Sequence, residues 1–336
     1  MNSIKVAING FGRIGRLSFR ALLQYPEIEI VAINDITDNK TLAHLLKYDS
    51  VQGMFPGTVG HDDQNLIVDG KKVASLKESD PTKLPWGAMG VDIVIESTGR
   101  FTKKEELEKH IQAGAKRVII SAPAKGDVPT FVIGVNDEKL TSDLTVISNA
   151  SCTTNCLAPM IKVLDDLVGI EHGFLSTIHA YTSDQKLQDS PHSDLRRARA
   201  AAVNIIPTST GAAEAVGKIL PHLNGKLTGG SFRVPVATGS ITDFVCTVKA
   251  DVTVEQINAA FKKASETTMK GILEYTDMPL VSTDIIGNKH SCIFDSDLTM
   301  VNGGRLVKVV GWYDNESGYS NRLAQITSML GKLVKA

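Results

Sequence analysis

The chain contains 336 residues, of which 42% are hydrophobic and 22% charged, and its formal net charge is −1. This composition is that of an ordinary globular protein of about two domains, and the near-neutral charge argues against a nucleic-acid binder as the main role. No apolar run approaches the ~20 residues of a membrane helix, and the N-terminus turns polar too early for a signal peptide, so we expect a cytoplasmic protein without a membrane segment.

The first predicted elements are typical of a nucleotide-binding unit. Residues 4–9 predict a strand, and residues 11–24 have apolar side chains at helical spacing. Between them lies the motif Gly10-x-Gly12-x-x-Gly15. Gly10 permits a tight turn, Gly12 lets the backbone approach a pyrophosphate, and Gly15 lets helix and strand pack closely. The unpaired amides at the helix start supply an anion site.

A second predicted strand, IEIVAIND, ends in Asp35. A carboxylate at this place can accept hydrogen bonds from a ribose diol, and it would repel a 2′-phosphate. The alternative is that Asp35 only caps the following turn, DITDN. In the context of strand, glycine motif and helix, we predict that NAD is the cofactor.

Further strands and helices alternate along the first half. This alternation predicts a Rossmann-type, doubly wound and mostly parallel sheet, whose ligands bind beyond the carboxyl ends of the strands. Ser97, Thr98, Gly99 and Ser121 follow two such ends and are expected to line the cofactor crevice, although Gly99 also suits a plain turn. The predicted strands are 91–98, 116–123, 130–135 and 144–150, and a helix is predicted over 102–114.

The segment NASCTTNC places Cys152 where a strand passes into a helix, with Asn149 or Ser151 as the N-cap. The positive end of the helix dipole favours a thiolate there. A disulfide to Cys156, one turn further on, has poor geometry, and no set of metal ligands stands nearby, so we predict no metal site. The other three cysteines suit packing.

A cysteine nucleophile needs a base, and His179 follows the apolar run GFLSTI. A histidine at a strand end is more often structural, but here it stands beside a crevice cysteine in a dinucleotide-binding chain. We predict that His179 takes up a proton during the reaction. Oxidation of an aldehyde with NAD requires a nucleophile, so Cys152 indicates aldehyde chemistry through a thioester.

A basic cluster, Arg196, Arg197 and Arg199, precedes the segment 208–211 (TSTG), which leads into a helix. Guanidinium groups, hydroxyls and amides together suit an anion. The alternatives are a solvated face or subunit contact for the arginines and an ordinary cap for the hydroxyls. The spacing alone does not decide between them.

The chain from Ser151 onward has longer alternating runs, which predict an α+β catalytic domain with a mixed, largely antiparallel sheet. Thr253 and Gln256 form a capping box before an amphipathic helix. Residues 319–336 read as a closing helix.

The motifs INGFGRIGR, ESTGRF, ASCTTNCLAP, HAYTSDQ, DLRRARAAAVNIIPTSTGAA, RVPV and WYDNESGYS occur in this order. Over essentially its whole length the sequence resembles phosphorylating, NAD-dependent glyceraldehyde-3-phosphate dehydrogenases of bacterial type. The resemblance implies oxidation of glyceraldehyde 3-phosphate with inorganic phosphate in glycolysis. It also implies a homotetramer, with a Rossmann domain of residues 1–150 plus 316–336 and a catalytic domain of residues 151–315.

The resemblance also implies roles for single residues. Cys152 matches the nucleophile and His179 the base. Thr182 and Arg233 match the site for the substrate's phosphate, and Asp35 the ribose ligand. The positions matched to the attacking phosphate are Ser151, Thr153, Arg197, Thr210 and Gly211, and those matched to further NAD contacts are Arg13, Ile14 and Asn315.

Two positions depart from the commonest family pattern. Ser79 stands where relatives often have a basic residue near the adenine, which we expect to change little because the contact there is largely through the backbone. Many NAD-dependent relatives have Leu before Pro191, where this chain has Ser190. An NADP-linked relative therefore stays as an alternative. Two others are an erythrose-4-phosphate dehydrogenase, whose reaction ends in hydrolysis, and a non-catalytic binding module.

Overall fold

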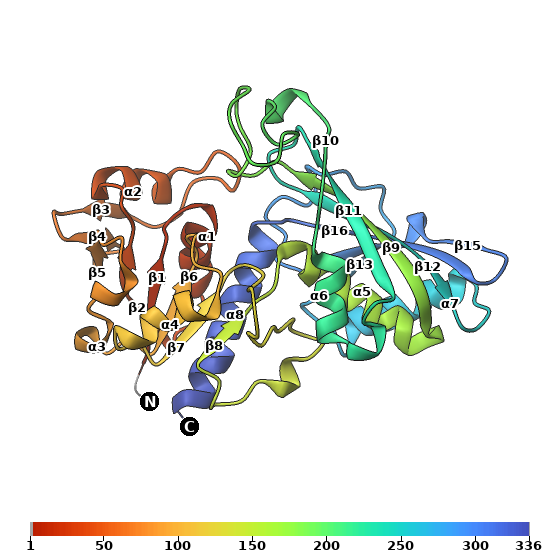
Figure 1. The fold of residues 1–336 in the computed structure, drawn as a ribbon, viewed down its shortest axis with the longest axis horizontal. Helices are drawn as coiled ribbons and strands as arrows, with labels where there is room; N and C mark the ends of the chain where they lie inside the picture. The colour runs from red at the N-terminus through yellow and green to blue at the C-terminus, as the bar shows by residue number, and fades with distance from the viewer. Residues whose placement is uncertain (1–2, 336) are drawn as a thin grey trace. The chain divides into compact units, whose positions relative to one another are not determined.

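The computed structural model describes residues 3–335, which form two compact units (Figure 1). The first unit takes the described residues up to Phe131, then Glu138–Ala150, and the described residues from Ser320 onward. The second unit takes Val132–Asp137 and Ser151–Tyr319. The C-terminal helix α8 (Ser317–Lys335) therefore begins in the second unit and contributes most of its length to the first.

The first unit is built on a sheet with the strand order β3-β4-β5-β2-β1-β6-β7-β8. Its strands are β1 (Ile4–Asn9), β2 (Ile28–Asn34), β3 (Val59–His61), β4 (Asn65–Val68), β5 (Lys71–Leu76), β6 (Ile93–Glu96), β7 (Arg117–Ile120) and β8 (Val146–Ser148). Its helices, besides α8, are α1 (Arg13–Leu22), α2 (Asn39–Lys47), α3 (Trp86–Met89) and α4 (Lys104–Gln112).

The strands from β5 to β8 run parallel, and β3 and β4 extend one edge as antiparallel strands. The central strands β1 and β6 are buried almost throughout, because a parallel sheet is covered on both faces. This burial explains their continuous apolar sequences. The predicted Rossmann-type sheet is confirmed.

One predicted strand is wrong. Residues 133–136 form a turn, residues 131 and 132 are irregular, and only Thr130 makes an isolated bridge, to Ser148. Val132 and Ile133 are nevertheless buried, and Gly134 has a φ of 84°. A short apolar run indicates burial but does not distinguish a strand from a buried turn.

The second unit contains a sheet with the order β10-β11-β9-β12-β16-β14-β13, and β15 pairs with β16. Its strands are β9 (Ile170–Ala180), β10 (Ile206–Thr208), β11 (Leu227–Val234), β12 (Ser240–Val248), β13 (Leu273–Thr276), β14 (Cys292–Asp295), β15 (Met300–Asn302) and β16 (Leu306–Tyr313). Its helices are α5 (Cys152–Val168), α6 (Ala212–Ile219) and α7 (Val254–Glu266).

This sheet is mixed, as predicted: β9 and β11 run parallel, as do β13 and β14, while the remaining pairs are antiparallel. Helix α5 lies against the sheet and contacts both α6 and α7 (Figure 1). The predicted capping box starts α7, because the Thr253 and Gln256 side chains each accept a hydrogen bond from the other's backbone amide. Within residues 3–335, no helix has the length and apolarity needed to span a bilayer.

Candidate active site

The glycine-rich turn between β1 and α1 has a steric reason for two of its glycines. Gly10 has a φ of 90°, and a Cβ there would lie 2.6 Å from the Thr98 amide nitrogen. A Cβ on Gly15 would lie 2.1 Å from the Gly10 carbonyl oxygen. Gly12, by contrast, has open space at its Cβ position and caps α1 without a side-chain hydrogen bond. The space beside Gly12, at the start of α1, is therefore open, which suits the approach of an anionic ligand to the helix N-terminus.

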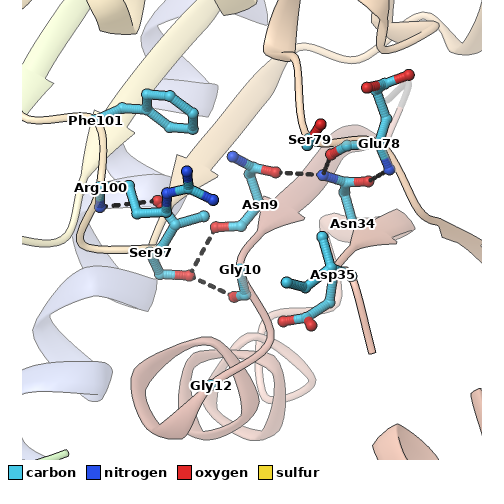
Figure 2. Close-up of a pocket in the computed structure, with 12 residues that line it drawn as sticks. Asn9, Gly10, Gly12, Asn34, Asp35, Glu78, Ser79, Ser97, Arg100 and Phe101 are labelled. Atoms are coloured by element: carbon cyan, nitrogen blue, oxygen red, sulfur yellow. Dashed lines mark hydrogen bonds between the residues drawn. The ribbon is translucent and has the colours of Figure 1, made fainter. Parts of the chain in front are cut away.

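A pocket opens above this turn in the first unit (Figure 2). Of the predicted cofactor residues, it is lined by Gly10, Gly12, Asp35, Ser97 and Thr98. Ser79, which the family pattern places near the adenine, lines it as well. Residues that sequence reasoning did not assign also line it, namely Asn9, Asn34, Ile36, Glu78, Arg100 and Phe101.

The other predicted cofactor residues of this unit, Arg13, Ile14, Gly99 and Ser121, do not line this pocket. The Arg13 guanidinium forms an ion pair with Asp49, and Ile14 is half-buried in the first turn of α1. Gly99 is an exposed turn residue with a φ of 70°, in keeping with the turn alternative. Ser121 directly follows β7, and its backbone amide donates to the carbonyl oxygen of Glu96.

Asp35 is held in place by two backbone amides. One carboxylate oxygen accepts from Phe11 at 2.8 Å and the other accepts from Thr37 at 3.0 Å. Asp35 thus caps its own turn and also lines the pocket, so the two readings of this residue are compatible. Each carboxylate oxygen has a second lone pair, which suits a ribose diol. The open space at Gly12 and this carboxylate fit the pyrophosphate and ribose of NAD.

In the second unit, Cys152 is the first residue of α5, and Ser151 is the N-cap. The Ser151 hydroxyl accepts a hydrogen bond from the Thr154 amide at 3.0 Å. The Cys152 Sγ lies 3.3 Å from the Nε2 of His179, which is near the end of β9. The predicted nucleophile and base are therefore in hydrogen-bond contact across 27 residues of sequence.

The electrostatics of this pair differ from the sequence prediction. Cys152 keeps part of its surface exposed, yet desolvation raises the pKa of its thiol above the ordinary value of 9.0, and the nearby Arg233 offsets this only in part. Desolvation of the thiol therefore opposes the thiolate that the helix start favours. Burial, together with the charge of Arg233, lowers the pKa of His179 to about 3. The imidazole is neutral at neutral pH and can accept the thiol proton.

Arg233 reaches His179 because of strand register. The two residues are direct partners in the parallel pair of β11 and β9. The Arg233 guanidinium contacts the Nδ1 of His179 and donates to the Ala180 carbonyl oxygen at 3.0 Å. The same carbonyl lies 2.7 Å from Nδ1. This fixed positive charge adds to the desolvation of the imidazole, and together they disfavour its protonation.

Comparison with known proteins adds to this geometry. Residues 4–104 match the family model of the glyceraldehyde 3-phosphate dehydrogenase NAD binding domain, and residues 151–315 match that of the C-terminal domain. The chain is 58% identical to the glyceraldehyde-3-phosphate dehydrogenase of Streptomyces coelicolor, over 98% of this chain and 99% of the relative. It is 56% identical to glyceraldehyde-3-phosphate dehydrogenase 1 of Bacillus subtilis and to the enzyme of Mycobacterium tuberculosis, at the same coverage.

This chain belongs to the glyceraldehyde 3-phosphate dehydrogenase family. The NAD-binding domain of the family includes the glycine turn and Asp35. The C-terminal domain of the family includes Cys152 and His179.

The residues predicted to bind phosphate fall into two groups, the arginines and the residues that offer a hydroxyl or an amide. Arg197 lies near enough to His179 for its charge to lower the pKa of that imidazole, so the two arginines Arg197 and Arg233 both act on the base. The Arg197 guanidinium also pairs with Asp184 at 2.6 Å and donates to Thr208 at 2.9 Å. Of the three arginines in the basic cluster, Arg197 is therefore neutralised by an ion pair inside the protein.

The second group consists of hydroxyls and amides. Thr210 accepts a hydrogen bond from Ala212 at 3.2 Å, and Gly211 caps α6. Thr182 donates its amide to Gln185 at 3.3 Å. These contacts are those of ordinary turns and caps, so the structure alone gives these three residues no catalytic role.

Tyr313 is a buried residue of the site that sequence reasoning missed. Its hydroxyl lies 2.9 Å from the hydroxyls of both Thr153 and Thr177, and its ring packs edge-on against His179. The Thr153 hydroxyl is therefore engaged inside the protein. The available signal was its position in WYDNE, two residues before the candidate cofactor residue Asn315.

Asn315 follows β16 and is buried. Its side-chain oxygen accepts from the Ser240 hydroxyl at 2.8 Å. The Thr238 hydroxyl lies 3.4 Å from the same oxygen and makes a shorter bond, at 2.9 Å, to the Asp314 carboxylate. The Ser240 hydroxyl therefore orients the amide group, with the amide nitrogen pointing away from it.

Proposed function

We propose that this protein oxidises D-glyceraldehyde 3-phosphate to 1,3-bisphosphoglycerate, using NAD and inorganic phosphate, as an enzyme of glycolysis. The observation that carries the proposal is the 3.3 Å contact between the Cys152 thiol and a neutral His179. It occurs in a chain whose relatives, 56–58% identical, bear the name glyceraldehyde-3-phosphate dehydrogenase.

In the first step, the Cys152 sulfur attacks the aldehyde carbon, and the thiol proton passes to the His179 Nε2. A C–S bond forms and the carbonyl becomes a tetrahedral alkoxide. The protonated His179 can donate this proton to the alkoxide oxygen and take it back before the hydride leaves, so it acts as a general acid and then as a general base. Loss of a hydride from this carbon restores the carbonyl and leaves a thioester on Cys152.

NAD, when bound, supplies the acceptor for that hydride. We propose that residues 1–150 plus 316–336 hold it, with Gly10, Gly12, Arg13 and Ile14 at the pyrophosphate and Asp35 at the ribose. Ser97, Thr98, Gly99 and Ser121 would line its crevice, and Asn315 would bond the carboxamide. Asp35 favours NAD over NADP, because its carboxylate repels a 2′-phosphate.

Residues 151–315 supply the chemistry in this proposal. Arg233 and Thr182 would bind the phosphate of the substrate. The attacking phosphate would be bound by a second set of residues, namely Ser151, Thr153, Arg197, Thr210 and Gly211. Inorganic phosphate adds to the thioester carbonyl and the C–S bond breaks, which releases the acyl phosphate and the free cysteine.

We also propose a cytoplasmic homotetramer. The segment 182–210 of the second unit leaves large apolar side chains exposed, including Leu187 at 80%, Leu195 at 82% and Val203 at 76%. Exposed apolar residues gathered in one segment are typical of a subunit contact. Copies of this chain would cover them in the assembly.

The test is NADH formation from glyceraldehyde 3-phosphate with and without inorganic phosphate, repeated with NADP and with erythrose 4-phosphate. We expect rapid turnover with NAD that depends on phosphate, and a single burst stoichiometric with subunits when phosphate is omitted. Steady turnover without phosphate would mean that water is the acceptor and would favour the erythrose-4-phosphate alternative. Equal use of NADP would contradict the role given to Asp35.

A further inference from the structure

Three neighbouring parallel strands of the first unit end in buried polar residues at the same level. Asn9 ends β1, Asn34 ends β2 and Glu96 ends β6. Asn9 is the direct register partner of both Asn34 and Glu96. Their exposed fractions are 2%, 4% and 1%. Buried polar groups persist in a protein when they are hydrogen-bonded, and these three bond to one another.

The bonds run across the strands. The Asn9 amide nitrogen donates to Glu96 Oε2 at 2.6 Å, and the Asn34 amide nitrogen donates to the Asn9 oxygen at 2.7 Å. Asn34 then clasps the backbone of Glu78, donating to its carbonyl at 2.8 Å and accepting from its amide at 2.9 Å. Figure 2 shows the part of this row that runs from Asn9 to Asn34 and on to Glu78, all of which line the pocket.

On its other side Glu96 contacts the His110 ring, which in turn is held by Trp86. The Trp86 indole nitrogen donates to the Nδ1 of His110 at 3.0 Å, and the His110 Nε2 lies 3.1 Å from Glu96 Oε2. An indole N–H can only donate, so Nδ1 has no hydrogen and Nε2 donates to the carboxylate. Glu96 Oε1 accepts from the Thr98 amide at 2.8 Å and contacts the Thr98 hydroxyl. Four donors thus face one carboxylate.

The residue that follows each of the three strand ends lines the pocket. Gly10 follows Asn9, Asp35 follows Asn34 and Ser97 follows Glu96. Ser97 also donates its hydroxyl to the Gly10 carbonyl at 2.7 Å. Movement of any strand end would therefore shift the glycine turn relative to the carboxylate of Asp35.

We propose that Glu96 and His110 are positioning residues for the cofactor pocket, acting through Asn9 and Thr98. They lock three strand ends and the Glu78 backbone so that the pocket is shaped before NAD arrives. Pre-organisation of this kind raises affinity by removing the cost of ordering the site on binding. The inference rests on the NAD binding assigned above.

The competing explanation is that the network only stabilises the fold. The same strand provides a matched control, because Asp92, just before β6, is another buried carboxylate. It accepts from the Lys5 amide at 2.9 Å and pairs with Lys116 at 2.8 Å and Lys335 at 2.9 Å, at the opposite end of the strand from the pocket. Asp92→Asn should therefore reduce stability without affecting the cofactor.

The experiment compares Glu96→Gln, His110→Phe and Asp92→Asn with the unaltered protein. Calorimetric titration gives the dissociation constant for NAD, and thermal unfolding gives the stability. We expect Glu96→Gln to weaken NAD binding by about tenfold or more, the loss of one charge-assisted hydrogen bond, and His110→Phe to weaken it in the same direction. The KM for NAD should rise by more than kcat falls, and Asp92→Asn should stay within about twofold in NAD affinity.

NAD affinities within about twofold of the unaltered protein for both Glu96→Gln and His110→Phe, alongside lower melting temperatures, would overturn the proposal and leave a purely structural role. If Glu96→Gln does not fold, His110→Phe decides, since it keeps a buried ring at this place and leaves the Glu96 carboxylate intact, while removing the bonds of His110 to Glu96 and Trp86. Failure of the unaltered protein to bind NAD would overturn the proposed function itself and this inference with it.

Discussion

Replacing His179 with Asn tests the assignment of base and nucleophile most directly. In the unaltered protein the pKa of His179 is about 3 and that of the Cys152 thiol is above 9.0. Between these values the protonation state of the pair does not change. Acylation should accordingly be nearly independent of pH across the neutral range, because the neutral imidazole takes the proton as the sulfur attacks.

The variant loses this base. Asn cannot accept the thiol proton at 3.3 Å, so only the small thiolate fraction reacts. We expect acylation at neutral pH to fall by about 100-fold or more, equivalent to about 2.7 kcal/mol of transition-state stabilisation. The remaining rate should rise by about tenfold per pH unit below the thiol pKa, since the thiolate fraction rises by that factor.

The assay is the stopped-flow burst of NADH without phosphate, followed from about pH 6 to about pH 9. His172→Asn serves as the control, since His172 is an exposed histidine at the other end of β9 and should leave the profile flat. A flat profile in the His179 variant, or a rate within a few-fold of the unaltered protein, would refute the role of His179 as base.

Cys152→Ser should abolish NADH formation while the calorimetric NAD affinity stays largely intact; loss of both would identify Cys152 as a structural residue. Gly15→Ala should lower the free energy of unfolding by about 3 kcal/mol, because its Cβ would lie 2.1 Å from a carbonyl oxygen. Gly12→Ala should lower it by less than about 1 kcal/mol but weaken NAD binding, and the reverse ranking in a denaturant titration would contradict the assignment of the turn. Tyr313→Phe should cost about 1–3 kcal/mol in the same titration, since it leaves two buried threonine hydroxyls without this partner, and a neutral effect would mean that they find others.

Sequence by itself was sufficient for features that depend on neighbours along the chain. The glycine turn, the capping box at Thr253 and the helix start at Ser151 each follow from local backbone sterics and local hydrogen bonds. The alternation of buried runs with amphipathic helices was enough to predict the parallel sheet. Motif order along the whole chain gave the family.

Tertiary structure decided what depends on register and burial. His179 and Arg233 are partners because β9 and β11 pair with one register, 54 residues apart, and no local pattern encodes that pairing. Desolvation raises the Cys152 pKa against the helix-dipole expectation, and residues 131–136 are buried without forming a strand. The Glu96–His110 contact likewise exists only after α4 packs against the sheet beside β7. Local sequence specifies conformation, but the electrostatic state of a side chain depends on which distant groups folding brings around it.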